Sequence, residues 1–282
     1  MRYLSPLRYP GGKARLGPFL DHMIRTSGLS NRLYVEPYAG GAGVGLYMLW
    51  KDTVSSIHIN DASPAIGAFW KALLEANSQF CDRVADATLT IDEWRAQRSI
   101  LTDPANASTL DLGFAAFYLN RTNRSGIISS GGVIGGLSQA GKWKMDARFN
   151  RDHLIERIQW IGERRDRIRL TDQDALALLL DLDDTVATFV YLDPPYYRNA
   201  ARLYDQWYHP EDHAAVCRTV KHLVHPWIVS YDDCPEVRHL YAGIRSCKVS
   251  LRYSAARSYL GAEVVFFSPE ISDSGIPVQN AQ

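Results

Sequence analysis

The fold is decided in the stretch YVEPYAGGAG, residues 34–43, where an apolar run ends in an acid and small residues follow. The run is typical of a buried strand, and the glycines open a helix near Gly43. A strand, a tight glycine turn and a helix form the first unit of a parallel α/β sheet. Such a turn lets a ligand approach the backbone and the helix N-terminus. It therefore predicts a ligand site, although a tight connection without a ligand has a similar sequence.

Short β-branched and aromatic runs alternate with segments of helical period along most of the chain. This alternation predicts an α/β fold with a mostly parallel sheet and helices on both faces. The expected strands are Leu33–Val35, Ile57–Asn60, Ile168–Thr171, Phe189–Leu192, Ile228–Ser230 and Val264–Phe267. The expected helices are Leu16–Arg25, Gly43–Leu49, Pro64–Leu74, Glu211–Leu223 and Pro235–Tyr241.

The alternation breaks between residues 76 and 150. Apparent helices at Thr90–Ser99 and Asp111–Leu119 lead into a glycine-rich segment, 125–141, in which a hairpin or an extended loop is expected. We therefore divide the chain into a first part of the main domain, 1–75, an inserted subdomain, 76–150, and a second part of the main domain, 151–282.

Composition excludes several classes of protein. The chain has 282 residues, 46% of them hydrophobic, and no apolar run long enough to span a bilayer or serve as a secretory leader. We therefore expect a soluble cytoplasmic protein without a membrane partner. The four cysteines form no C-x-x-C pair, so neither a metal site nor a disulfide framework is predicted.

Charge is informative only locally. Lysine plus arginine and aspartate plus glutamate both number 31, so the net charge says nothing about partners. From Arg121 to Arg151, however, Asp146 is the only acid among six basic residues. Such a segment fits a phosphate backbone, and it also fits a solvated basic surface.

A second acid follows the next expected strand. Asp61 ends the stretch SIHIND, residues 56–61, about 20 residues after the glycine turn. From that position a carboxylate binds ribose hydroxyls in dinucleotide folds. Asp61 is therefore a candidate ribose ligand, and it is equally placed to cap the helix that begins near Ser63.

The strongest motif is DPPY, residues 193–196, directly after the apolar run FVYL. It lies at the carboxyl end of a buried strand, the edge at which open α/β sheets bind ligands. Two prolines fix φ and remove backbone donors, so they stop the strand and hold the Pro194 carbonyl in one direction. Asp193 and Pro194 are therefore predicted to form a rigid pair of hydrogen-bond acceptors.

Together these motifs resemble the Dam-like class of adenine-specific DNA methyltransferases, in which DPPY is the catalytic motif. YPGGK, residues 9–13, resembles the family's W-A-G-G-K element, and residues 36–43 resemble its E-P-F-x-G-x-G turn. LNRTNRSG, residues 119–126, resembles its L-N-R-x-x-x-x-G element. The order of turn, insertion and DPPY is that of the family's alpha arrangement. The chain departs from the pattern at Tyr9, in place of tryptophan, and at Ala42, in place of a glycine.

The resemblance implies a Rossmann-like S-adenosylmethionine-dependent methyltransferase fold whose helical or hairpin insertion recognises the target. It implies that Tyr9 and Lys13 contact S-adenosyl-L-methionine, that Asp61 binds its ribose and that Asp174 accepts from its adenine amino group. The full set of expected cofactor-binding residues is Tyr9, Lys13, Glu36, Tyr38, Ala39, Gly40, Gly41, Gly43, Asp61, Asp174 and Asp193. The expected catalytic residues are Asp193, Pro194, Pro195 and Tyr196.

Physical chemistry indicates how such a site acts. The lone pair of an adenine amino group is delocalised into the ring, so acceptors at Asp193 and Pro194 are needed to draw density back onto nitrogen. The base must be flipped out of the duplex, and Tyr196 is expected to stack on it. The candidate DNA-binding residues of the insertion are Arg121, Asn123, Arg124, Lys142 and Lys144.

Other readings stay open at this point. The same acceptors suit an RNA adenine or the amino group of a DNA cytosine, and a cofactor-binding DNA regulator without catalysis is a third alternative. Double-stranded DNA is the expected partner and a monomer the expected state. A cognate restriction endonuclease and a role outside restriction are both compatible with the sequence.

Overall fold

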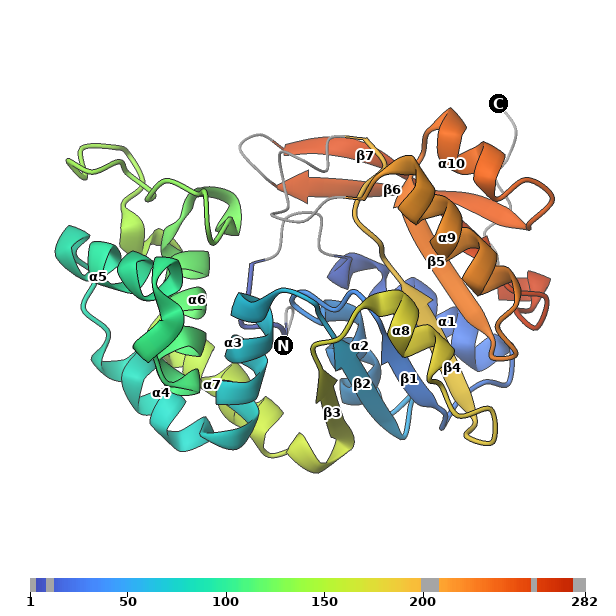
Figure 1. The fold of residues 1–282 in the computed structure, drawn as a ribbon, viewed down its shortest axis with the longest axis horizontal. Helices are drawn as coiled ribbons and strands as arrows, with labels where there is room; N and C mark the ends of the chain where they lie inside the picture. The colour runs from blue at the N-terminus through green and yellow to red at the C-terminus, as the bar shows by residue number, and fades with distance from the viewer. Residues whose placement is uncertain (1–3, 9–12, 199–207, 255–257, 276–282) are drawn as a thin grey trace. The chain divides into compact units, whose positions relative to one another are not determined.

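The computed structural model describes residues 4–8, 13–198, 208–254 and 258–275. The chain forms two compact units, and Figure 1 labels the helices and strands that belong to each. The first unit comprises Met1–Gly12 and Asp61–Asp172, and the second comprises the remaining segments, Lys13–Asn60 and Gln173–Gln282. The predicted insertion, 76–150, falls within the first unit, and its boundaries stay a prediction.

One sheet organises the α/β part of the chain. Its strands are β1 (Leu33–Glu36), β2 (Ser56–Asn60), β3 (Ile168–Thr171), β4 (Thr188–Leu192), β5 (Trp227–Asp232), β6 (Ser246–Ser254) and β7 (Ser258–Phe267). The order is β3-β2-β1-β4-β5-β7-β6. Strand β1 pairs in parallel with β2 and β4, and β4 with β5, whereas β7 is antiparallel to β5 and β6. The order 3-2-1-4-5 is that of doubly wound sheets, so the predicted α/β, Rossmann-like fold is confirmed.

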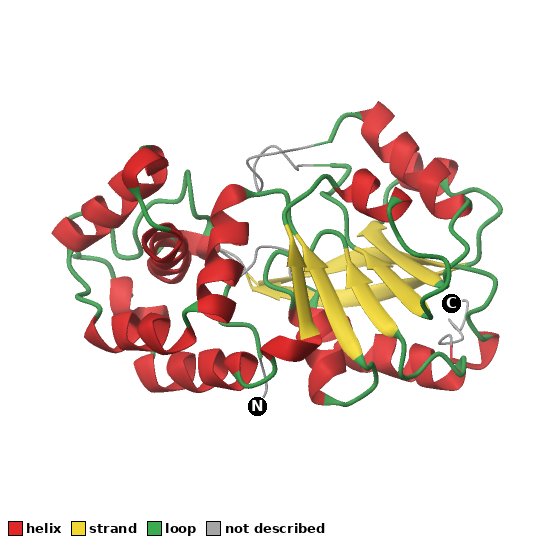
Figure 2. Ribbon diagram, turned by 60° about the horizontal axis from the view of Figure 1, so that its bottom comes forward, coloured by secondary structure: helices red, strands yellow, loops and turns green. Residues whose placement is uncertain are grey.

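Successive residues of the central strands enter two different apolar layers, as strand geometry requires. Val35 and Val190 pack in the layer of α8 (Ala175–Leu180), α9 (Pro210–Lys221) and α10 (Pro235–Leu240). Their neighbours Tyr34 and Phe189 stack with ring centroids 6.2 Å apart, on the side of α2 (Gly43–Trp50). Helix α1 (Gly17–Thr26) completes this second layer, and Figure 2 shows helices on both sides of the yellow sheet.

The first unit is mainly helical and has an aromatic core. Its helices are α3 (Pro64–Glu75), α4 (Asn77–Asp86), α5 (Ile91–Thr102), α6 (Thr109–Thr122) and α7 (Arg151–Gly162). Phe69, Phe80 and Phe117 pack with ring centroids 5.5 to 6.1 Å apart. Gly113 lets α6 approach α3 closely, because a Cβ there would lie 2.5 Å from the carbonyl oxygen of Ala68.

The segment between α6 and α7 is an extended loop, one of the two forms that the sequence predicts. Within the described residues its strand-like pairing is a single antiparallel bridge between Asn123 and Val133. Short 3-10 turns occur in the chain at Ala14–Leu16, Pro104–Asn106, Arg124–Gly126, Met145–Arg148, Arg165–Arg167 and Asp273–Gly275. Among the described residues, no helix combines the length and the apolarity that a bilayer crossing requires.

Candidate active site

Asp193 stands where a central strand ends. It follows β4, all five residues of which are buried. Its Oδ1 accepts a hydrogen bond from Ser230 Oγ at 2.9 Å and forms an ion pair with Lys13 Nζ at 3.1 Å. Within the described part of the chain Asp193 Oδ2 has no such partner, and the side chain is 19% exposed. One carboxylate oxygen is therefore fixed by the protein and the other is accessible.

The surroundings of Asp193 act on its pKa in opposite directions. Burial raises the pKa of its carboxyl, and this effect exceeds the opposing effects of Lys13 and Ser230. Ser230 is itself held by a 2.8 Å hydrogen bond with the Tyr191 hydroxyl. The carboxylate is thus oriented by a chain of buried groups on β4 and β5.

Lys13 joins Asp193 to two further side chains. Its ammonium donates to the Tyr196 hydroxyl at 3.2 Å and lies 4.6 Å from the centre of the Tyr196 ring. It also lies 3.6 Å from Glu263 Oε1, and the Tyr196 hydroxyl donates to the same oxygen at 3.4 Å. Lys13 and Glu263 are both buried. Glu263, on β7, is absent from the predicted site; its sequence signal is an acid inside the apolar stretch AEVVFF, residues 262–267.

The turn after β1 requires small residues, as predicted. Gly40 and Ala42 have left-handed φ values of 48° and 46°, and a Cβ at Gly43 would lie 2.8 Å from that of Ala14. Glu36 accepts hydrogen bonds from the Gly45 amide at 3.1 Å and the Tyr34 hydroxyl at 3.3 Å, so it braces α2 against β1. These contacts give Glu36 a structural role beside its predicted one.

Other predicted cofactor residues belong to the ends of strands and helices. Tyr38 shares a 3.2 Å hydrogen bond with the Tyr208 hydroxyl. Asp174 is exposed, and its Oδ1 caps α8 by accepting from the Leu176 and Ala177 amides at 2.9 and 3.1 Å.

Asp61 follows β2 directly, and its Oδ1 accepts from the Ser63 amide at 2.9 Å, the capping role considered above. Tyr9 lies outside the described residues.

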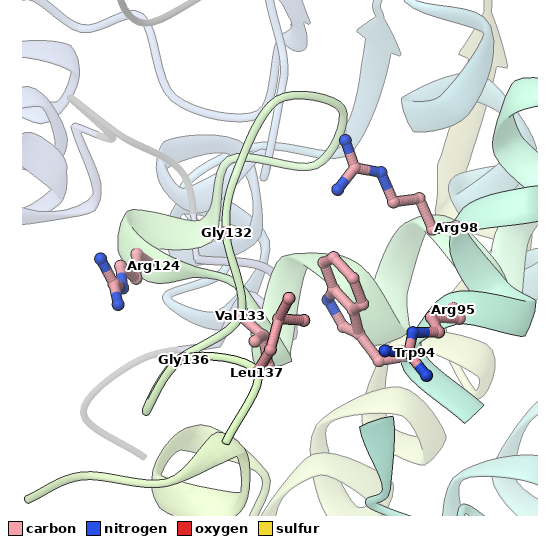
Figure 3. Close-up of a pocket in the computed structure, with 8 residues that line it drawn as sticks. All are labelled: Trp94, Arg95, Arg98, Arg124, Gly132, Val133, Gly136 and Leu137. Atoms are coloured by element: carbon pink, nitrogen blue, oxygen red, sulfur yellow. The ribbon is translucent and has the colours of Figure 1, made fainter. Parts of the chain in front are cut away.

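The first unit contains a basic pocket of about 340 Å³ beside Arg124. Figure 3 shows Trp94, Arg95 and Arg98 of α5 on one side and residues of the loop after α6 on the other. The loop residues are Arg124, Gly132, Val133, Gly136 and Leu137. Three arginines and an apolar floor thus surround one hollow. Lys142 and Lys144, also predicted to bind DNA, are exposed on the same loop.

Asn123, one of the predicted DNA-binding residues, is buried. Asn123 accepts from Trp94 Nε1 at 2.7 Å and donates to the carbonyls of Ile127 and Ile128 at 2.8 and 3.1 Å. This side chain therefore shapes the loop, which does not favour a contact with a base. Its neighbour Asn120 is structural as well, because it bonds the Arg8 amide and carbonyl at 2.7 and 2.8 Å.

Arg121 is a partly buried cation near other positive charges, and its Nε is buried. Burial and the positive charges of Arg8, Arg157 and Arg148 together lower the pKa of Arg121 to about 9. Its Nε has no hydrogen-bond partner among the described residues. Buried cations are normally paired, so this group of four arginines is suited to an anion.

The chain was compared with known proteins. Among solved structures it is similar to a conserved hypothetical protein from Streptococcus pyogenes, with 8% identity and a TM-score of 0.35, over 85% of this chain and 88% of that one. It is also similar to a proposed RNA methyltransferase from Pyrococcus horikoshii, with 10% identity and a TM-score of 0.40, over 93% of this chain and 85% of that one. Likenesses this distant carry no conclusion about function. No curated protein gives a significant match.

A protein-family model matches most of the chain. Residues 9–255 match the family described as D12 class N6 adenine-specific DNA methyltransferase. The matched range contains the small-residue turn, the loop after α6 and the site residues Lys13, Asp193 and Tyr196, and it ends before Glu263. It favours adenine in DNA over the RNA and cytosine alternatives. The chain therefore belongs to the family of D12 class N6 adenine-specific DNA methyltransferases.

Proposed function

We propose that this enzyme transfers the methyl group of S-adenosyl-L-methionine to the N6 nitrogen of an adenine flipped out of duplex DNA at a specific sequence. Adenine methylation of DNA follows from the family. The observation that carries the finer proposal is the state of Asp193: its Oδ1 is held by Lys13 and Ser230, while its Oδ2 is accessible at the end of β4.

The acceptors activate the amine by drawing its hydrogens into fixed hydrogen bonds. Asp193 Oδ2 and the Pro194 carbonyl each accept one N6 hydrogen, which favours a tetrahedral nitrogen with a localised lone pair. That lone pair forms the new N–C bond while the electron pair of the broken C–S bond stays on sulfur. The surplus proton on N6 passes to Asp193 Oδ2 and then to solvent, which the raised pKa of this carboxyl assists. Tyr196 stacks on the flipped base.

The residues after β1 fit S-adenosyl-L-methionine, which supplies a methyl group activated on a sulfonium. Gly40 and Gly41 carry no side chain over the backbone between β1 and α2, whereas Gly43 makes room for Ala14, whose Cβ would lie 2.8 Å from a Cβ at Gly43. The exposed Asp174 keeps Oδ2 without a partner among the described residues, so it can accept a hydrogen bond from an adenine amino group. Lys13 and Asp193 would hold the cofactor from the side of the catalytic motif, and Asp61 would hold its ribose.

The basic features of the first unit support duplex DNA as the substrate. The group Arg8, Arg121, Arg148 and Arg157 has the charge and the unsatisfied donor that a backbone phosphate would satisfy. The pocket beside α5 combines apolar side chains with Arg124 and two further arginines. Such a lining suits a base edge with phosphates on either side of it. Exposed Lys142 and Lys144 would add phosphate contacts.

We further propose that the enzyme acts on DNA as a monomer, because one chain carries the cofactor turn, the catalytic motif and the basic loop. A cognate restriction endonuclease is a second proposed partner. The test of this function is transfer of labelled methyl from S-adenosyl-L-methionine to unmethylated duplex DNA of mixed sequence, with RNA of the same sequence as the comparison. Label in DNA alone is expected, and label in RNA alone would contradict the proposal.

A further inference from the structure

We propose that Glu263 is a positioning residue of the methyl-transfer site, which holds Lys13 and Tyr196 in the arrangement that orients Asp193. This inference rests on the function proposed above. Glu263 lies on β7, far along the chain from the turn after β1 and from the DPPY motif. Its printed contacts are with Lys13 and the Tyr196 hydroxyl, so its contribution is to fix these two side chains beside Asp193.

Lys13 and Tyr196 both contact the same oxygen of Glu263. Its Oε1 lies 3.6 Å from Lys13 Nζ and 3.4 Å from the Tyr196 hydroxyl. Lys13 in turn donates to that hydroxyl at 3.2 Å and pairs with Asp193 Oδ1 at 3.1 Å. Lys13, Tyr196 and Glu263 therefore form a closed triangle, and Asp193 is attached to its lysine corner.

Burial makes this triangle rigid. The side chains of Lys13 and Glu263 are only 2% and 3% exposed, so water does not compete for their charges. Two charges removed from water persist only when they are paired and hydrogen-bonded. Glu263 is thus the counter-ion that keeps Lys13 buried next to Asp193.

The count of charges explains why a second carboxylate is useful. With Asp193 alone, Lys13 would neutralise the acceptor and weaken its attraction for the amino hydrogens. With Asp193 and Glu263 sharing one lysine, the group keeps a net charge of minus one. During the transfer, positive charge passes from sulfur to N6, and a fixed negative charge close to N6 stabilises that change.

The direct contact with Tyr196 has a separate consequence. The ring of Tyr196 is held by its hydroxyl between Lys13 and Glu263. Because the ring is already held in one position, it loses little conformational entropy when a base stacks on it.

The test is Glu263→Gln, which keeps the shape of the side chain and removes its charge. Glu270→Gln is the matched control, because Glu270 is exposed shortly after the end of β7. The assay measures kcat, the KM for duplex DNA and the Kd for S-adenosyl-L-methionine, with thermal unfolding of each variant as the check on folding. We expect kcat to fall roughly 10- to 100-fold in Glu263→Gln, with the KM for DNA changed less than about threefold, because only groups near the reacting nitrogen are displaced. Glu270→Gln should match the wild type.

Combining Glu263→Gln with Lys13→Met and Tyr196→Phe separates positioning from general stabilisation. If Glu263 acts through Lys13 and the Tyr196 hydroxyl, adding Glu263→Gln to the Lys13→Met, Tyr196→Phe variant should lower single-turnover transfer by less than about twofold further. Independent, multiplying losses would overturn the proposal. If Glu263→Gln does not fold, Tyr196→Phe serves instead, because it keeps the ring and removes the hydroxyl of the triangle. A several-fold lower kcat at unchanged cofactor Kd is expected, and an unchanged kcat would overturn the inference.

The activity of the wild type distinguishes a failure of the positioning role from a failure of the proposed function. A wild-type protein that methylates DNA, together with a folded Glu263→Gln variant of near-normal kcat, would overturn the positioning role alone. A folded wild-type protein that binds the cofactor and transfers no methyl to DNA would overturn the proposed function, on which the inference rests.

Discussion

Replacing Ser230 by alanine removes one of the two donors that fix Asp193. Ser230 is fully buried; it donates to Asp193 Oδ1 at 2.9 Å and shares a 2.8 Å hydrogen bond with the Tyr191 hydroxyl. A hydrogen bond to a charged group contributes about 1.5–3 kcal/mol. Because each 1.36 kcal/mol is a factor of ten, loss of the orientation that this bond provides should lower kcat/KM roughly 10- to 150-fold.

The same substitution changes the response to pH. Burial raises the pKa of the Asp193 carboxyl, and the hydrogen bond from Ser230 works against that rise. Without the serine the pKa should rise further, so the carboxylate becomes protonated at a higher pH. Because a protonated Asp193 is a poorer acceptor for the amino hydrogens, the acidic limb of the kcat/KM profile should move to higher pH.

The assay is labelled-methyl transfer to duplex DNA across a series of pH values, with Ser230→Thr as the control that retains a hydroxyl. Denaturant unfolding should show a loss of about 1–3 kcal/mol in Ser230→Ala, because the buried Tyr191 hydroxyl loses its partner. A folded Ser230→Ala enzyme with kcat/KM within about twofold of wild type and an unmoved acidic limb would refute this reasoning.

Three further predictions concern stability and DNA binding. Ala42→Gly should raise the free energy of unfolding by up to about 1 kcal/mol in urea titrations, because alanine is strained at a φ of 46°; a loss of stability would contradict this. Gly113→Val should lower the melting temperature and cost about 1–3 kcal/mol or more, because α6 would be forced away from α3, whereas Gly132→Ala, which meets nothing within 4 Å, should change little. Arg121→Gln should weaken duplex binding and reduce the slope of log affinity against log salt by about one, since one phosphate contact is lost; an unchanged slope would remove Arg121 from the phosphate site.

The sheet and the position of the DPPY motif could be predicted because the patterns that encode them are local. In β4 an apolar run is closed by two prolines, and the position of Asp193 at the end of that strand follows directly. The glycine turn after β1 could also be predicted, since glycine adopts the left-handed φ of 48° at Gly40 without strain.

Glu263 could not be assigned from the sequence because its role depends on a partner far away in the chain. An acid in the middle of a strand normally faces solvent, and only the fold brings Glu263 to Lys13. Strand β6 was missed for a related reason. Its alternating polar and apolar residues, SCKVSLRYS, become a strand by pairing with β7.

The roles of Arg121, at the end of α6, and Asn123, directly after it, could not be predicted from residue type because they depend on burial. Helix α6 is buried on nearly all sides from Gly113 to Asn120, so the polar residues at its end enter the protein interior. Asn123 is engaged by hydrogen bonds with Trp94 and with carbonyls of the loop, and Arg121 becomes the partly buried cation of a basic group. Arg124, Lys142 and Lys144 are exposed, and their DNA contacts stay predictions.

The most direct test of the central claim is the identity of the nucleoside that gains the methyl group. Unmethylated duplex DNA is incubated with S-adenosyl-L-methionine and either the wild type or Asp193→Ala, digested to nucleosides and analysed by mass spectrometry. The account predicts N6-methyldeoxyadenosine with the wild type and a loss to background with Asp193→Ala. Methylated cytosine with the wild type, or near-normal methyladenine with a folded Asp193→Ala variant, would contradict it.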